Sequence, residues 1–124
     1  TTVTADNTAI DPKPMTILVN RYTASASEIT AGALQDDGIG VLVGEKTFGK
    51  GVVQTLTNLP DGAGIKITTA HYYTPKNHDI NLKGIVPDVP VVENRDGRFG
   101  EIGHDLQLQA ALELLAKKLA DVKP

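Results

Sequence analysis

The sequence predicts an α/β protein, because short apolar segments of strand type alternate along its 124 residues with segments of helical periodicity. The runs Met15–Asn20 and Ile39–Gly44 are short, rich in β-branched residues and bounded by turn residues, as buried strands are. Between these runs, and again near the C-terminus, apolar residues recur at the spacing of an amphipathic helix. We therefore expect mixed β-strands with two main helices.

The first predicted helix begins at a serine that follows the first strand. The segment Ser25–Glu28 fits the Ser-x-x-Glu capping box, in which the serine caps the helix and the glutamate binds back to the serine backbone. Apolar residues then follow at helical spacing until Asp36, Asp37 and Gly38 end the helix. A strand enters this turn and a helix leaves it.

The segment after the second strand predicts a loop and then an antiparallel ribbon. Residues 44–51 are rich in glycine and indicate the loop. Residues 52–59 and 65–73 have strand character, and the turn at 60–64 lies between them. Prolines limit residues 85–92 to an edge strand at best.

The last part of the chain predicts a charged linker followed by an amphipathic helix. Asp105 is expected to cap this helix, and one apolar stripe that packs on the sheet is expected from Leu106, Ala110, Leu114 and 116–119. We divide the chain into an extended N-terminal segment (1–11), a core (12–93), and the linker with its helix (94–124). Because no initiator Met opens the chain, we expect a piece cut from a longer polypeptide.

Composition narrows the classes of function. The 12 Lys and Arg residues are scattered and the formal net charge is −3, so nucleic acid is not a favoured partner. The absence of cysteine excludes disulfides, thiolate zinc sites and a thiol nucleophile. No apolar run approaches the ~20 residues that cross a bilayer. No histidine pair has the i, i+4 spacing of a zinc site, so we expect no metal site.

Ser25 is the candidate nucleophile, because it stands where a strand ends and a helix begins. Unpaired backbone N–H groups and the positive end of the helix dipole can stabilise a developing oxyanion there. The alternative interpretation is that Ser25 only caps the helix, which is the commoner role for a serine in this motif.

Lys50 is the candidate general base, since it lies between Gly49 and Gly51 in the predicted loop. A lysine can accept a proton from serine only when an apolar environment favours its neutral amine. Gln54 lies four residues on, where a strand would turn it to the same face, and its uncharged amide could hold that amine. A solvated loop lysine is the simpler alternative. A triad with His71, His78 or His104 also stays open, although none of them lies in a supporting motif.

Several segments, in order, resemble the carboxyl-terminal processing (tail-specific) proteases, which are serine-lysine peptidases of the S41 type. The resemblance runs over roughly residues 12–92, through a nucleophile region at 15–36, a lysine loop at 43–54, and downstream segments at 69–75 and 83–88. The resemblance implies that Ser25 is the nucleophile, Lys50 its general base and Gln54 the third member, with the Ala26 backbone N–H in the oxyanion hole. The sequence departs from the family at Tyr22-Thr23, where Gly-Ser is usual.

The implied fold is a layered α/β fold of the crotonase and Clp-peptidase kind, with this chain as the second half of the catalytic core. Family members carry, upstream, a peptide-binding PDZ domain and the first half of the core, whose Gly-rich turn lends an oxyanion N–H. The 124 residues of this sequence contain neither the PDZ domain nor the first half of the core. Since losing one oxyanion donor costs ~10²–10³ in rate, we expect the isolated chain to be inactive.

The implied reaction is hydrolysis of peptide bonds near the C-termini of proteins with apolar tails, without a cofactor. The resemblance further implies a periplasmic, exported or membrane-associated location and leaves a homo-oligomer open. Two other classes stay open, namely a non-catalytic binding or scaffold fragment and a crotonase-like acyl-thioester enzyme. The latter would need a pocket for a nucleotide-bearing cofactor, for which the sequence offers no support.

Overall fold

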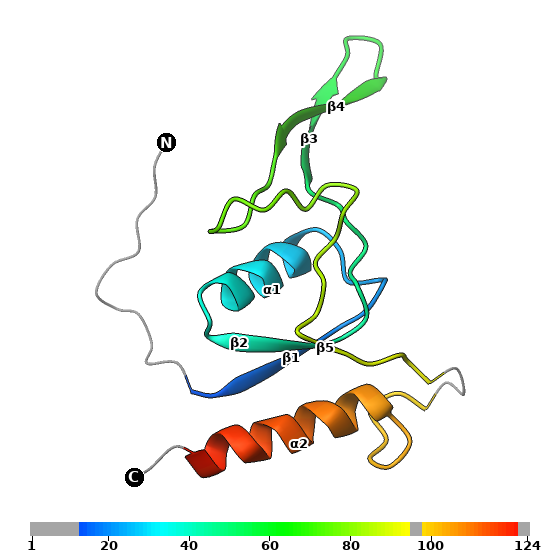
Figure 1. Ribbon diagram of the computed structural model, residues 1–124. Coiled ribbons are helices and arrows are strands. Elements are labelled where there is room, and N and C mark those ends of the chain that lie inside the picture. The colour runs from blue at the N-terminus through cyan, green and yellow to red at the C-terminus, as the bar shows by residue number, and fades with distance from the viewer. Residues whose placement is uncertain (1–12, 95–97, 122–124) are drawn as a thin grey trace.

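A computed structural model describes residues 13–94 and 98–121, so the predicted N-terminal segment 1–11 lies outside the described residues. Figure 1 shows a small sheet between two helices, with a long hairpin projecting away from it. The elements, in chain order, are β1 (Met15–Val19), α1 (Ala26–Asp36), β2 (Gly40–Gly44), β3 (Val52–Asn58), β4 (Gly64–His71), β5 (Val89–Pro90) and α2 (Leu106–Asp121). This architecture confirms the predicted α/β class.

The main sheet has the strand order β1-β2-β5, and both neighbouring pairs are parallel. The first two strands pair in register from Met15 with Gly40 to Val19 with Gly44. Because parallel strands need a crossover connection, α1 joins them across one face of the sheet. The strand β5 lies at the edge, as its proline requires, since Pro90 has no N–H to donate to a further strand.

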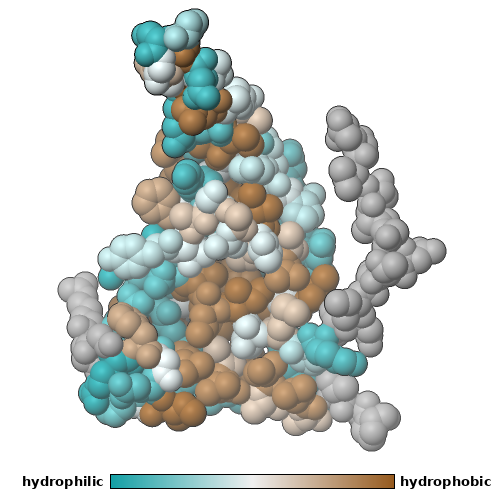
Figure 2. Space-filling view, turned by 180° about the vertical axis from the view of Figure 1, so that it is seen from behind, coloured by the Kyte–Doolittle hydropathy of each residue, from teal (hydrophilic) through white to brown (hydrophobic). Residues whose placement is uncertain are grey.

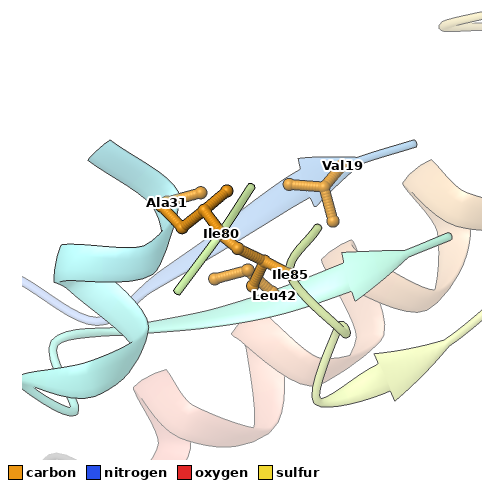
Figure 3. Close-up of a cluster of buried hydrophobic side chains, with 5 residues drawn as sticks. All are labelled: Val19, Ala31, Leu42, Ile80 and Ile85. Atoms are coloured by element: carbon orange, nitrogen blue, oxygen red, sulfur yellow. The ribbon is translucent and has the colours of Figure 1, made fainter. Parts of the chain in front are cut away.

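The hydrophobic core lies between α1 and the sheet. Figure 3 shows its members, which are Val19 of β1, Ala31 of α1, Leu42 of β2, and Ile80 and Ile85 of the later loop. The Leu42 side chain is 0 % exposed, and burying a side chain of this kind stabilises the fold by about 1.5–3 kcal/mol. The loop after the hairpin is therefore fixed on the core.

The hairpin of β3 and β4 has little covering it. Every residue of β4 is exposed, and the large apolar side chains of Leu56, Ile65 and Ile67 are 67 %, 43 % and 53 % exposed. Viewed from behind, apolar surface covers the middle of the molecule and continues up the hairpin (Figure 2). A lone two-stranded hairpin is only marginally stable in water, so this surface is suited to contact with further polypeptide.

Asp105 caps α2 as the sequence predicts. Its Oδ1 accepts a hydrogen bond from the Leu108 N–H at 2.9 Å, and its Oδ2 accepts one from the Gly100 N–H at 2.8 Å. The donors at Leu108 and then Gly100 hold the pKa of Asp105 below its usual value. The cap thus ties the loop before α2 to its first turn.

The face of α2 that packs on the sheet differs from the predicted stripe. Leu106 and Leu119 are 47 % and 53 % exposed, whereas Gln107 and Ala111 are buried. Gln107 can be buried on this face because its Nε2 donates a hydrogen bond to the carbonyl oxygen of Val91 at 2.9 Å. This hydrogen bond selects the face that lies against the sheet.

Candidate active site

Ser25 lies at a strained turn between β1 and α1. Its backbone adopts φ 59° and ψ −121°, a conformation that side chains with a Cβ rarely adopt and that costs on the order of 1–3 kcal/mol. Among the described non-glycine residues, positive φ is found at Ser25, Asn77 and Leu82. A sharp strand-to-helix turn that exposes a serine is the geometry of a nucleophile elbow.

The capping box that the sequence predicts is present, with the Ser25 side chain facing the Glu28 backbone N–H and the Glu28 side chain facing the Ser25 backbone N–H. The Ser25 N–H donates to Glu28 Oε2 at 2.9 Å, while the Glu28 N–H donates to the carbonyl oxygen of Ser25 at 2.9 Å. The capping box alone does not account for the strained backbone of Ser25, so the geometry is compatible with both a capping role and a nucleophile role.

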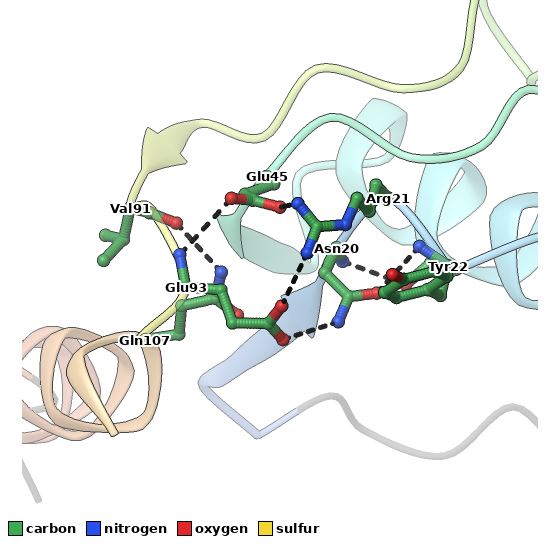
Figure 4. Close-up of polar contacts among 8 residues, drawn as sticks. Asn20, Arg21, Tyr22, Glu45, Val91, Glu93 and Gln107 are labelled. Carbon is green, nitrogen blue, oxygen red and sulfur yellow. Dashed lines mark hydrogen bonds and ion pairs between the residues drawn. The ribbon is translucent and has the colours of Figure 1, made fainter. Parts of the chain in front are cut away.

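The turn before Ser25 is anchored by the polar cluster shown in Figure 4. Asn20 Nδ2 donates to Glu93 Oε1 at 3.0 Å. Arg21 lies 3.6 Å from Glu93 Oε2 and 3.8 Å from Glu45 Oε2. Exposed ion pairs of this length contribute little singly, but together they join the end of β1 to the segments after β2 and β5.

Glu28 is buried in the first turn of α1, with 0 % of its surface exposed. Its carboxylate accepts hydrogen bonds from the Ser25 N–H, the Lys50 N–H, the Gly49 N–H and the Thr47 hydroxyl. A buried carboxylate costs several kcal/mol unless its oxygens are hydrogen-bonded. These four donors meet that requirement, and no ion pair to Glu28 is found among residues 13–94 and 98–121.

The lysine loop is fixed to the nucleophile turn along its length. The Phe48 N–H donates to the carbonyl oxygen of Thr23 at 2.9 Å, and Thr47, which is 5 % exposed, accepts from the Ile85 N–H at 2.7 Å. Gly49 has φ +92°, and a Cβ there would lie 2.9 Å from the backbone nitrogen of Gly84. The close approach of these loops thus requires glycine.

The three predicted side chains line one open pocket of about 270 Å³. Its lining consists of Ser25, Lys50, Val52, Val53, Gln54, Lys66 and Tyr72. Ser25 is half-buried, while Lys50 and Gln54 are exposed. Gln54 Nε2 makes a long contact of 3.5 Å with Thr68 Oγ1. Within residues 13–94 and 98–121, no hydrogen bond directly joins the side chains of Ser25, Lys50 and Gln54, and such contacts often tighten only with substrate.

The backbone N–H of Ala26 opens α1 and makes no hydrogen bond to another described residue. It lies directly after Ser25, at the positive end of the helix dipole. An N–H in this position can donate to an oxyanion that forms on a substrate attacked by Ser25.

None of the three histidines, His71, His78 and His104, belongs to the lining of this pocket, although His71 pairs with the lining residue Val52 across the hairpin. His78 Nδ1 lies 3.5 Å from Asp36 Oδ1. These two residues line a separate cavity of about 360 Å³ that contains neither Ser25 nor Lys50. In the described part of the chain, no group of three or more His, Asp or Glu side chains is arranged to hold a metal ion.

The family model for peptidase family S41 matches residues 2–91, and the chain belongs to this family. It is 57% identical over 109 residues to a carboxyl-terminal-processing protease of Picosynechococcus sp., covering 86% of this chain and 26% of that protein. It is 54% identical over 86 residues to a chloroplastic C-terminal processing peptidase of Tetradesmus obliquus, covering 68% of this chain and 18% of that protein.

The fold has a counterpart among solved structures. A photosystem II D1 C-terminal processing protease matches 71% of this chain and 23% of its own chain, with a TM-score of 0.66 and 52% identity. The chain therefore has the α/β fold of S41 proteases and spans about a quarter of the length of the relatives it matches. No helix among the described residues is long and apolar enough to span a bilayer.

Sequence reasoning identified Glu28 as part of a cap but missed its contacts with the lysine loop. The Ser-x-x-Glu spacing predicts the contact with the Ser25 backbone, since it is local. The contacts with Thr47, Gly49 and Lys50 cross 19 to 22 residues of sequence. They depend on how the loop folds over α1, for which the sequence carries no local signal.

Proposed function

We propose that this chain carries the catalytic residues of a serine peptidase, with Ser25 as nucleophile and Lys50 as general base. The observation that carries the proposal is the strained turn at Ser25, which places this serine in the lining of the pocket that Lys50 and Gln54 also line. A strained backbone at a pocket is a common mark of a functional site.

In the proposed reaction, the Ser25 oxygen attacks the carbonyl carbon of the scissile peptide bond as the neutral Lys50 amine takes the hydroxyl proton. The Ala26 N–H donates to the oxyanion of the tetrahedral intermediate. The Lys50 ammonium then protonates the leaving amine, and the C–N bond breaks to leave an acyl-enzyme. Lys50 next takes a proton from water, whose oxygen attacks the ester carbonyl carbon. Lys50 then returns this proton to the Ser25 oxygen as the ester C–O bond breaks, which releases the second product and restores both the serine hydroxyl and the neutral amine. Gln54 orients the Lys50 amine.

The isolated chain is proposed to be inactive. A lysine serves as a base when its amine is shielded from water, and Lys50 is exposed in this chain. The exposed apolar residues of the hairpin stand next to the same pocket. We propose that polypeptide corresponding to the uncovered three quarters of the relatives, including a first half of the core and a PDZ domain, covers the hairpin and closes the pocket.

The proposed substrates are proteins with apolar C-termini, which are cleaved near those ends. The relatives are named for carboxyl-terminal processing, and one solved structure is a protease that processes the C-terminus of photosystem II D1. A periplasmic or otherwise exported or membrane-associated location, and a homo-oligomeric assembly, remain expectations of the same resemblance.

The test uses a chimaera in which this chain replaces the matching segment of the Picosynechococcus protease, to which it is 57% identical. The assay follows degradation of an unstructured protein with an apolar C-terminus. We expect Ser25→Ala and Lys50→Ala each to lower the rate by about 10⁴-fold or more. Ser27→Ala, which removes a hydroxyl two residues away, should retain activity. Wild-type rates in both dyad variants would refute the assignment and favour a non-catalytic role for these residues.

A further inference from the structure

Glu28 has contacts that exceed what a helix cap needs. A capping glutamate accepts one hydrogen bond, from the backbone of the N-cap residue. Glu28 accepts that bond from Ser25 and three more from the loop that carries Lys50. Since the side chain is 0 % exposed, water does not compete for these contacts.

One oxygen atom of Glu28 joins the backbones of the two residues in the proposed dyad. Its Oε2 accepts from the Ser25 N–H at 2.9 Å and from the Lys50 N–H at 2.8 Å. The other oxygen, Oε1, accepts from the Gly49 N–H at 2.7 Å and from the Thr47 hydroxyl. A single carboxylate therefore bridges the backbones of the proposed nucleophile and base.

The contacts require a carboxylate and not merely a side chain of the same shape. All four partners donate to Glu28, and an ionised carboxylate offers about four acceptor sites and no donor. A glutamine at this position would turn an N–H₂ group toward two of the donors. It would therefore lose contacts with the loop while preserving the volume of the side chain.

Thr47 extends this arrangement to the core. Its hydroxyl donates to Glu28, and its Oγ1 accepts from the N–H of the core residue Ile85 at 2.7 Å. On the other side of the loop, the Leu82 N–H donates to the carbonyl oxygen of Gly49 at 2.8 Å. The lysine loop is thus held between α1 and the loop that follows the hairpin.

We propose that Glu28 and Thr47 are positioning residues, which set the distance between Ser25 and Lys50 for the proposed peptidase reaction. The proposal rests on the proposed function for its catalytic consequence and on the hydrogen bonds for its structural part. Neither residue lines the pocket of Ser25 and Lys50, so both act through the backbones that they hold.

The structural part is tested by amide hydrogen exchange in the 124-residue chain. Glu28→Gln replaces one of the two acceptor oxygens by a donor, so it should speed exchange of either the Gly49 amide or the Lys50 amide by roughly tenfold or more, according to which oxygen is replaced. The Phe48 amide donates to Thr23 instead and serves as the internal reference. Glu113→Gln, the same change at an exposed position of α2, should leave the exchange of Gly49 and Lys50 unchanged. Wild-type exchange of these two amides in Glu28→Gln would overturn the proposed attachment.

The catalytic part is tested in the chimaera by separating kcat from KM. Glu28→Gln should lower kcat by about 10²-fold with little change in KM, since a displacement near 1 Å costs that much. Thr47→Val, which removes the hydroxyl but keeps the shape, should also lower kcat, and Thr47→Ser should restore it. Ile80→Val, a mild core change, controls for lost stability and should keep kcat.

The outcomes separate this inference from the proposed function. Wild-type kcat in Glu28→Gln, with Ser25→Ala inactive, overturns the positioning role and leaves the dyad intact. The positioning role is also overturned if Thr47→Ser lowers kcat as much as Thr47→Val does, because the hydroxyl would then have no effect. Full activity of Ser25→Ala overturns the dyad and, with it, the catalytic consequence assigned to Glu28.

Discussion

Replacing Ser25 by glycine should stabilise the chain, although Ser25 is proposed to be essential for activity. At φ 59° and ψ −121°, any residue with a Cβ is strained by about 1–3 kcal/mol. Glycine relieves this strain, at a cost of about 0.5–1 kcal/mol in chain entropy. Alanine keeps the strain and removes only the hydroxyl. The strain relieved less the entropy cost is about 0–2.5 kcal/mol, so we expect Ser25→Gly to be more stable than Ser25→Ala by about 1 kcal/mol.

Ser27 provides the matched control, because it lies two residues on, inside α1, where no positive φ is found. At a helical position, glycine is less stable than alanine by about 1 kcal/mol. The entropy cost of glycine affects the comparison of glycine with alanine at both positions. The difference between the two comparisons therefore measures the strain at Ser25, which is about 1–3 kcal/mol.

The assay is urea unfolding of the four variants, with the midpoints compared at equal slopes. Thermal unfolding gives a second measure, in which 1 kcal/mol moves the midpoint by about 3–5 °C for a chain of this length. If the glycine variant at Ser25 is less stable than the alanine variant, as at Ser27, then the turn is not strained. The main structural support for the nucleophile would then be lost.

Two further predictions concern stability. Gly84→Ala should cost at least about 3 kcal/mol, because Gly84 has φ +65° and a Cβ there would overlap the Thr47 carbonyl oxygen. Gly62→Ala, at φ +83° with open space around it, should cost only about 1 kcal/mol, and equal losses in urea unfolding would contradict the contact with Thr47. The folded pKa of Asp105 is lowered by the Leu108 and Gly100 N–H groups, so its stabilisation is present above the unfolded value of about 3.9 and is lost as pH falls below it. Asp105→Asn keeps a capping oxygen but has no carboxyl group to titrate, so the free energy of unfolding should fall less between about pH 5 and pH 2 than it does in the wild type. An unchanged pH dependence would contradict this role of Asp105.

The fold class was predicted from local sequence patterns, which were reliable where the structure of a segment depends mainly on its own residues. The β-branched runs became β1 and β2, and the proline of β5 placed it at a sheet edge. The face of α2 was less predictable, because Gln107 is polar yet buried by its hydrogen bond to Val91. Hydrophobic periodicity alone cannot anticipate a buried polar residue that has found a partner.

The candidate residues were predicted more fully than their surroundings. Ser25, Lys50 and Gln54 were selected by motif and resemblance, and they line one pocket. The strain at Ser25 was not predicted, since a capping box implies a relaxed N-cap. The reach of Glu28 to Lys50 was not predicted either, because it depends on packing between segments 22 residues apart.

The central claim is that Ser25 is a nucleophile activated by Lys50, and covalent labelling tests it most directly. The chimaera would be treated with a serine-directed fluorophosphonate, and the modified residue would be located by mass spectrometry. We predict that the label lies on Ser25 and not on Ser27, that Lys50→Ala abolishes it, and that the isolated 124-residue chain is not labelled. Labelling of a different residue, or undiminished labelling of Ser25 in Lys50→Ala, would contradict the dyad.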